Sequence, residues 1–229
     1  MPTIYSATTD ESMISTTSTT WSTARDGSTG YLGNASDTYE TYGVTVFRFA
    51  GRGADQYRVI RSFFHFDTSG ITATVSAATF KLYMYGVQGD SNVIVLASDA
   101  FTGGSGALAT DDFDNLDFST PYSGEVDNSG EGLISITLNA AALAAMTSSN
   151  DFKIAVVNFD YDYNNTAPTS GSTHGASVRY ADYSGTSSDP QIDYTLATGY
   201  GHIVSGVAAA NIGKVDGVAT ANISKVIGV

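Results

Sequence analysis

The residues with catalytic side chains are scattered along this sequence and match no catalytic motif. The three histidines, His65, His174 and His202, lie far apart and fit no H-E-x-x-H pattern or other ligand spacing. No G-x-S-x-G turn presents a serine nucleophile, and there is no glycine-rich phosphate-binding loop. The absence of cysteine excludes disulfides, thiolate zinc sites and cysteine nucleophiles. The sequence therefore predicts a protein that is not an enzyme and carries no cofactor.

Aspartates gather in two segments and are the candidate ligands for a metal ion. The six residues are Asp111, Asp112, Asp114, Asp117, Asp160 and Asp162. Clusters of carboxylate oxygens can bind calcium, a hard cation that prefers oxygen ligands, but the EF-hand spacing is missing. A solvated acidic loop is the favoured interpretation, with calcium binding as the alternative. Paired carboxylates also catalyse glycoside hydrolysis, yet no pattern in the sequence indicates a cleft for a glycan chain.

Tyrosine is abundant, with 14 residues in the chain, and several of them cluster in the last third. The candidates for stacking on sugar rings or filling a protein interface are Tyr161, Tyr163, Tyr180 and Tyr183. The alternative is that these residues are ordinary strand formers at sheet edges, and the sequence leaves the two interpretations open. The single tryptophan, Trp21, is expected to anchor the core.

Alternating apolar and polar residues predict the β-strands that must position these side chains. The predicted strands span residues 44–50, 57–67, 79–87, 92–98, 133–138, 152–161, 176–181 and 190–196. The strand at 57–67 is apolar on both faces, as expected in the centre of a sandwich. A short helix is predicted over 139–146 with Asn139 as its N-cap, and residues 99–132 form a turn-rich acidic loop. The pattern predicts an all-β fold, an antiparallel two-sheet sandwich.

The chain is strongly acidic, with a formal net charge of −13 over 229 residues. Only 10 residues are Lys or Arg, so no clustered basic surface is expected for nucleic acid or for an anionic membrane. No stretch is long and apolar enough to span a bilayer. The first residues, MPTIYSATTDESMIS, lack the basic and apolar regions of a signal peptide. The chain is therefore expected to be made in the cytoplasm of a host cell, without nucleic acid or membrane partners.

Three segments of the sequence resemble the DNRLRE-type domain family. Residues 61–71, RSFFHFDTSGI, are similar to its R-S-L-L-x-F-D-L-S-x-I core, and 75–83, VSAATFKLY, to its V-x-x-A-x-L-x-L-Y strand. Residues 183–192, YSGTSSDPQI, resemble its closing E-x-x-G-x-x-x-P-x-L segment. The resemblance covers residues 1–197, although the family's D-x-x-I opening is blurred at 10–14. It implies a jelly-roll sandwich related to carbohydrate-binding modules, a fold also found on secreted and virion proteins.

The end of the chain is an 11-residue repeat with the pattern V-x-G-V-A-x-A-N-I-x-K. Residues 204–214, VSGVAAANIGK, precede 215–225, VDGVATANISK, and eight of the eleven positions are identical. A partial copy, VIGV, follows at 226–229. The repeat has few bulky side chains and cannot build a core, so it must stack on copies of itself, lie on a partner or stay disordered. The chain therefore divides into a sandwich, residues 1–198, and a repeat tail, residues 199–229.

The tail is expected to mediate assembly or docking. The residues assigned to this role are Val204, Gly206, Val207, Asn211, Ile212, Val215, Gly217, Val218, Asn222 and Ile223. The glycines are expected to mark turns, and Val207-Ala208 and Val218-Ala219 are predicted to form short strands. The tail resembles those at the C-termini of bacteriophage structural and appendage proteins. The alternative is a flexible terminus without a role.

The predicted sandwich and its tail favour a non-enzymatic structural protein of a bacteriophage virion, either a capsid decoration (cement) protein or a fibre or tail appendage subunit. Its expected location is the virion, and its expected partners are other virion proteins and copies of itself. The alternative is a carbohydrate-binding module that recognises a cell-surface or extracellular polysaccharide, which would add host glycans as partners. That alternative, and the third hypothesis of a polysaccharide-degrading enzyme, leave the tail unexplained.

Overall fold

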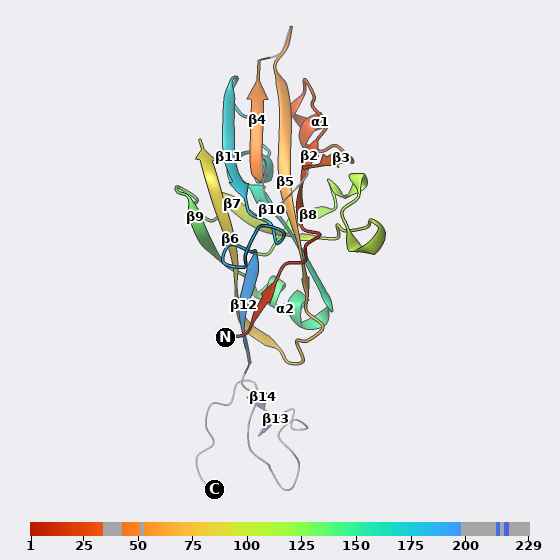
Figure 1. Cartoon of the computed structure of the whole chain (residues 1–229), viewed down its shortest axis with the longest axis vertical. Helices are drawn as coiled ribbons and strands as arrows, with labels where there is room; N and C mark the ends of the chain where they lie inside the picture. Colours follow the sequence, from red (N-terminus) through yellow and green to blue (C-terminus); the bar gives the residue numbers. More distant parts are fainter. Residues whose placement is uncertain (34–42, 51–52, 198–213, 216–217, 220–229) are drawn as a thin grey trace.

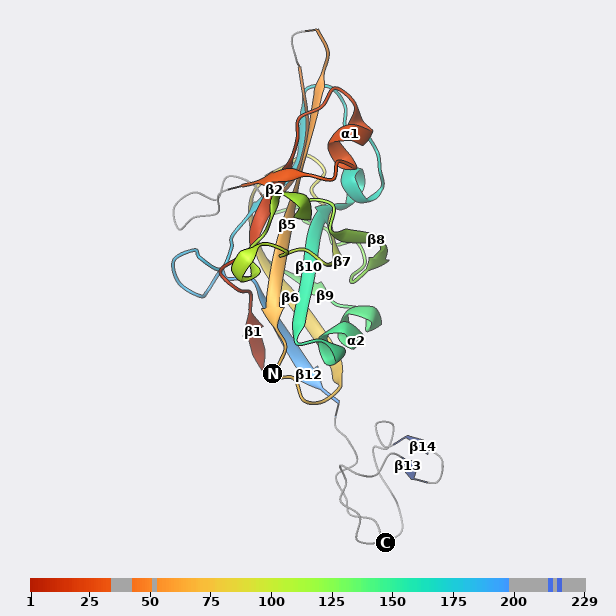
Figure 2. The ribbon, with the colours of Figure 1, turned by 90° about the vertical axis from the view of Figure 1, so that its right-hand side faces the viewer.

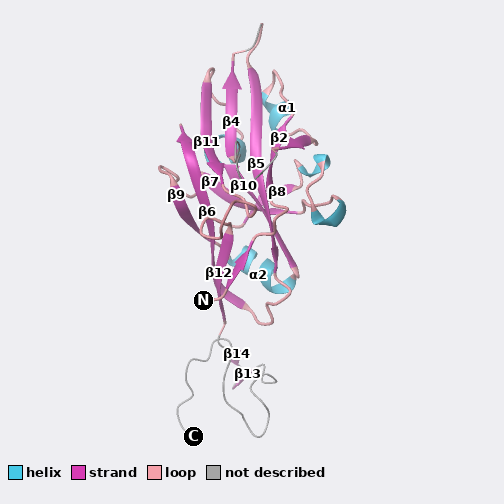
Figure 3. Cartoon of the chain, viewed as in Figure 1, coloured by secondary structure: helices cyan, strands magenta, loops and turns pink. Residues whose placement is uncertain are grey.

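Antiparallel strands form most of the regular structure in the computed structural model, which describes residues 1–33, 43–50, 53–197, 214–215 and 218–219 (Figure 1 and Figure 3). The fold is an all-β antiparallel sandwich of the jelly-roll class, as the sequence predicts. The strands of the sandwich are β1 (Thr3–Tyr5), β2 (Glu11–Ser15), β3 (Gly30–Leu32), β4 (Val44–Phe49), β5 (Gln56–Asp67), β6 (Val75–Gln88), β7 (Val93–Ser98), β8 (Leu116–Pro121), β9 (Gly132–Thr137), β10 (Asp151–Asn158), β11 (Ser172–Val178) and β12 (Gln191–Leu196).

The helical elements are short and lie between strands. They are α1 (Trp21–Arg25), α2 (Ala140–Ser148), the 3₁₀ turns η1 (Gly104–Gly106) and η2 (Thr110–Asp112), and the π-helical turn η3 (Phe159–Tyr163). Within the described residues, no helix combines the length and the apolar character needed to cross a lipid bilayer.

Two sheets face each other, and β5 belongs to both. The first sheet is centred on β6, which has β9 on one side and β12 and β11 on the other; β1 continues it beyond β12, and β4 beyond β11. The second sheet runs from β5 through β10 and β7 to β8, with β2 and β3 on the opposite side of β5. Strand β5 reaches both sheets because its first half pairs with β4 and its second half with β10.

The main core fills the space between the two sheets. Strand β6 contributes Phe80, Leu82 and Met84, and β5 contributes Phe64 and Phe66, all of them fully buried. The intervening residues of β6 point away from the core, as the alternation of side chains along a strand requires. The apolar alternation along β6 therefore identifies which face of this strand is inside.

The outer face of the second sheet is also buried, because the segment between β7 and β8 folds over it. Phe63 of β5 and Ala155 of β10 pack there against Phe101, Leu108 and Phe113 in a second apolar cluster. This packing explains why β5 is apolar on both faces, which confirms the prediction for the strand at 57–67.

The β4–β5 hairpin and the end of β12 mark opposite ends of the sandwich (Figure 1 and Figure 2). The hairpin projects beyond its neighbours at one end. At the other end, the backbone N–H of Ala197 donates a hydrogen bond of 2.7 Å to the carbonyl oxygen of Thr74.

Several elements differ from the sequence prediction: β1, β2, β3 and α1 are additional, and the strand predicted over 176–181 lies at Ser172–Val178. The strand predicted over 152–161 ends at Asn158, because Asn158 Oδ1 accepts a hydrogen bond from the Tyr161 backbone N–H and starts the π-helical turn η3. The loop predicted over 99–132 contains β8, whose edge pairing with β7 the turn-rich sequence hides. Helix α2 follows Asn139 as expected, since Asn139 Oδ1 accepts hydrogen bonds from the first turn of the helix.

Candidate binding face

The tail residues predicted to mediate assembly lie almost entirely outside the described residues. Those outside are Val204, Gly206, Val207, Asn211, Ile212, Gly217, Asn222 and Ile223. The other two, Val215 and Val218, lie opposite each other in β13 (Lys214–Val215) and β14 (Val218–Ala219), which pair antiparallel. The dipeptide between these strands is Asp-Gly, a sequence typical of a two-residue hairpin turn. The prediction of a short strand at Val218-Ala219 is confirmed.

Of the four tyrosines considered as candidates for glycan or interface contacts, Tyr180 is buried in the main core. It is 1% exposed, its ring stacks on Phe64 with centroids 5.8 Å apart, and its hydroxyl lies 2.7 Å from Ser62 Oγ. Burial raises the pKa of Tyr180 well above the usual value. The residue lies two positions after the inward-facing Val178, and it continues that face after β11 has ended. Tyr180 therefore cannot stack on an external ligand.

Tyr161 and Tyr163 lie in η3 and have partners inside the protein. The Tyr161 hydroxyl donates to Asp90 Oδ2 at 2.7 Å, and its ring centroid lies 4.2 Å from that of His174. Burial and the hydrogen bond to Asp90 raise the pKa of Tyr161 to about 12. Tyr163 stacks on Phe159 with centroids 5.5 Å apart. These contacts hold the π-helical turn on the sandwich.

Among the aspartates considered as calcium ligands, Asp112 organises the covering loop. Its carboxylate accepts hydrogen bonds from the backbone N–H groups of Phe101, Thr102 and Ala109 and from the side chains of Thr102 and Asn115. Burial acts to raise the pKa of Asp112, but these hydrogen bonds outweigh it, and the pKa lies below the usual value. Its lone pairs are occupied by protein donors, so Asp112 has a structural role.

The other five aspartates do not converge on one point. Asp111 and Asp114 are exposed, and Asp117 accepts hydrogen bonds from Ser119 and Thr120 of its own strand. Asp160 is partly buried in η3, and burial together with neighbouring carboxylates raises its pKa. Asp162 is fully buried in an ion pair. In the described part of the chain, no group of three or more His, Asp or Glu side chains is arranged to hold a metal ion.

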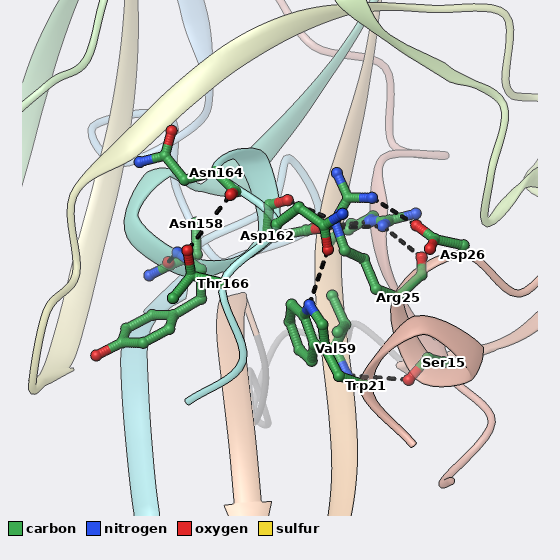
Figure 4. Close-up of polar contacts among 12 residues, drawn as sticks. Ser15, Trp21, Arg25, Asp26, Val59, Asn158, Asp162, Asn164 and Thr166 are labelled. Carbon is green, nitrogen blue, oxygen red and sulfur yellow. Dashed lines mark hydrogen bonds and ion pairs between the residues drawn. The ribbon is translucent and has the colours of Figure 1, made fainter. Parts of the chain in front are cut away.

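A buried ion-pair network fixes α1 and η3 against the second sheet (Figure 4). Arg61 Nε and Nη2 donate to the two carboxylate oxygens of Asp162 at 2.8 and 2.9 Å, and neither side chain is more than 1% exposed. Arg61 also donates to the carbonyl oxygens of Phe113 and Arg25, and Arg25 Nε donates to the carbonyl oxygen of Asp162. The bidentate geometry satisfies both buried charges. The sequence signal for this network is Arg61, an arginine within the apolar run of β5.

Trp21 holds α1 in place at the edge of this network. Its indole Nε1 donates to Asn165 Oδ1 at 2.9 Å, and its ring meets Tyr57 edge-on with centroids 5.9 Å apart. The residue is partly buried and packs against the second apolar cluster. Trp21 therefore supports the covering layer, and the main core is filled by other aromatics.

The carboxyl group of Asp10 lies in surroundings opposite to those of Asp112. Burial raises the pKa of Asp10 well above the usual value, and the nearby Asp182 and Asp189 act in the same direction. The backbone N–H of Ala181 donates to both oxygens of Asp10, which opposes this effect only in part. Asp10 thus links the start of β2 to the loop before β12.

Among the described residues, the outward-facing side chains of β6 are only partly buried, and this makes the outer face of the first sheet the candidate binding face. A β-bulge in β6 interrupts this face of the sheet. Ser177 of β11 pairs with Tyr85, whereas Gly175, two residues earlier, pairs with Gln88, three residues later. The bulge adds one residue to β6 and includes Gly86, whose φ of 59° is in the left-handed region. The bulge turns Gln88 to the same outer face as Tyr85.

The hollow beside the bulge has a volume of about 160 Å³. Its polar side chains come from Thr45, Gln88, Thr173 and Ser177, and Phe47 supplies an aromatic wall. Gly175 forms part of the lining, and a Cβ atom there would clash with the backbone of β4, so only glycine fits.

Next to this hollow, an arginine is stacked between tyrosines. The guanidinium carbon of Arg179 lies 4.3 Å from the ring centroid of Tyr83 and 4.1 Å from that of Tyr183, and Tyr85 is 5.9 Å away. Arg179 Nη1 donates to Ser188 Oγ, which holds the guanidinium in place. Tyr183 is therefore the one predicted tyrosine that lies beside the open face. Tyr83 and Tyr85, which join it there, carry the aromatic surface.

Hydroxyl, amide and aromatic groups around a shallow hollow match the chemistry of a polyhydroxylated ligand, which needs hydrogen bonds and an aromatic stacking surface. The side chains that line the hollow include no carboxylate and no histidine, so this part of the described structure offers binding groups without a general acid or base. Comparison with known proteins adds no family assignment: no family model matches this chain, and no curated protein sequence matches it at a significant level.

Proposed function

We propose that this chain is a non-enzymatic structural protein of a bacteriophage virion, either a capsid decoration (cement) protein or a subunit of a fibre or tail appendage. The observation that carries the proposal is the 11-residue repeat at residues 204–225. A repeat without bulky side chains is stabilised by contact with copies of itself or with a partner surface. Other virion proteins and further copies of this chain are the proposed partners, and the virion is the proposed location.

In this proposal the sandwich is displayed and the tail attaches it. The pairing of β13 with β14 supports a tail that forms short strands around its Val-x-Gly-Val segments. Short strands with unpaired edges can join strands from another chain through backbone hydrogen bonds. The exit of the chain at Ala197, opposite the β4–β5 hairpin, would leave that hairpin and the open face directed away from the attachment point (Figure 1).

The test is the mass in solution of the full chain and of a chain that stops at Thr198, measured by light scattering. We expect the full chain to form a defined oligomer and the shortened chain to be a folded monomer, because the tail is removed from an otherwise complete sandwich. Folding of the shortened chain is checked by circular dichroism and by a cooperative urea transition. Identical masses for two folded chains would contradict a role of the tail in self-assembly.

The second candidate function is recognition of a cell-surface or extracellular polysaccharide, and the hollow of the open face favours it. Bacterial surface polysaccharides would be screened on an array with the wild-type chain, Gln88→Ala and Tyr85→Thr. Loss of an observed signal in both variants, with retention in the control Tyr31→Thr, supports this function. Tyr31 is a suitable control because it is 43% exposed and lies on β3, outside the hollow. Equal signals from all four chains would contradict it.

A further inference from the structure

A shallow apolar groove lies beside helix α2. Helix α2 and strand β12 lie at the same end of the sandwich (Figure 2). Its volume is about 400 Å³. The walls are Thr74 and Val75 on one side and Ala140, Leu143, Ala144 and Thr147 of α2 on the other. Thr74 is also the residue that accepts the hydrogen bond from the backbone N–H of Ala197. The groove therefore begins where the body of the sandwich ends.

Helix α2 is only half covered, although its sequence suits complete burial. Residues 140–146, AAALAAM, are apolar on every side of the helix. Ala142 and Met146 are fully buried against the main core, whereas Ala141 and Ala144 are exposed. A helix that is apolar all round is normally buried all round. Among the described residues, no element covers the outer side of α2.

The repeat tail has the composition and the position to cover this groove. Its apolar residues are valine, alanine and isoleucine, and alanine on the helix surface allows a second backbone to approach closely. The groove itself contains no charged side chain. The six residues 198–203 can span about 20 Å when extended, so the first repeat starts within reach of a groove at this end of a sandwich.

We propose that this groove binds the repeat tail of a second copy of the chain. The inference rests on the proposed function, since it names the surface that receives the tail. Each copy carries the groove directly beside the point where its own tail begins. Two copies related by a two-fold axis can therefore exchange tails reciprocally, so that each tail lies in the groove of the other copy. The product is a closed dimer. Once one tail is bound, the second binds at a high effective concentration.

Cysteine pairs test this contact in the full chain, which has no cysteine of its own. Two chains with different tags are co-expressed, one carrying Ala144→Cys in the groove and the other carrying Val207→Cys or the equivalent Val218→Cys in the tail. After mild oxidation, we expect a mixed disulfide between the two chains, identified by mass spectrometry. The control pairs the same tail cysteines with Phe49→Cys, which is exposed at the far end of the sandwich and should give no mixed disulfide.

The alternatives to a second copy give different products. A chain that carries both Ala144→Cys and a tail cysteine would close on itself, at the mass of one chain, if its own tail filled the groove, and that result overturns the proposal. The absence of any disulfide at Ala144 in chains that light scattering shows to be oligomeric also overturns it, while the proposed assembly role of the tail survives. The two proposals can therefore fail separately.

A charge placed in the groove gives a second measurement. We expect Ala144→Glu to weaken self-association at least tenfold, because the carboxylate would be buried by the incoming tail. The matched control is Ala141→Glu, an exposed alanine of the same helix that does not line the groove, and its association should be unchanged. Equal association of both variants, with circular dichroism showing that both are folded, would overturn the proposal.

Discussion

The two outer faces of the sandwich differ in how their polar groups are used. On the second sheet, residues between β7 and β8 cover the face, and the buried Asp112 and Asp162 are saturated by protein donors. On the first sheet, Gln88 and its neighbours surround a hollow that opens to solvent. The comparison teaches that Asp112 and Asp162, two of the aspartates that the sequence offers as metal ligands, serve the fold. The hydroxyl, amide and aromatic residues of the open face are those available to a ligand.

The largest expected effect comes from breaking the ion pair under the covered face. Arg61→Met leaves Asp162 buried without its bidentate partner, and we expect a loss of about 3–5 kcal/mol in the free energy of unfolding. The measurement is urea denaturation, with the slope used to check two-state behaviour. The matched control is Arg58→Met on the same strand, whose guanidinium contacts only Thr17 and Phe49 among the described partners. It should lose less than about 1 kcal/mol. Equal losses of stability in the two variants would show that the buried ion pair of Arg61 contributes no more to stability than Arg58 does.

A smaller effect is expected from Asp112→Asn in the covering loop. The amide cannot accept all five hydrogen bonds, and we expect a loss of about 1–3 kcal/mol at neutral pH. The pKa of Asp112 is lowered in the folded state. The ionised carboxylate therefore stabilises the fold fully above the ordinary aspartate pKa, and this stabilisation is lost as the pH falls through the pKa of the folded state. The stability gap between the wild-type chain and the variant should therefore close in acid.

Asp10→Asn supplies the opposite pH dependence as a control. The pKa of Asp10 is raised in the folded state, so the ionised group destabilises the fold above that pKa, and acidification towards the ordinary aspartate value relieves the penalty. The wild-type chain should gain stability relative to this variant as the pH falls. Urea titrations of the three chains across the acid range measure both trends, and parallel pH profiles for the two variants would refute the assignment.

The smallest effect on stability is expected on the open face. Tyr85→Thr keeps a residue that favours strands, so the free energy of unfolding should change by less than about 1 kcal/mol. Phe113→Ala on the covered face removes a fully buried ring and should cost about 3–5 kcal/mol. Thermal or urea denaturation of both variants measures the contrast. A large loss for Tyr85→Thr would mean that this face is part of the stabilising structure, which would weaken its assignment as a binding surface.

The sequence by itself determined the fold class and much of the strand pattern. The alternation along β6 identifies its inward and outward residues, and Asn139 marks the start of α2, because these signals depend only on neighbouring residues. The division into sandwich and repeat tail also follows from the sequence pattern, and it stays a prediction for residues 199–229 outside β13 and β14.

Only the tertiary structure decided the roles of individual polar and aromatic side chains. Tyr180 and Tyr183 are three residues apart in a similar local sequence, yet one is buried on Phe64 and the other is stacked on Arg179. Likewise, Asp162 belongs to an ion pair with a residue about a hundred positions away in the chain. Periodicity reports local geometry, whereas burial and pairing depend on which distant strands and loops meet. The structure was therefore needed to separate the residues that hold the sandwich together from those that can bind a partner.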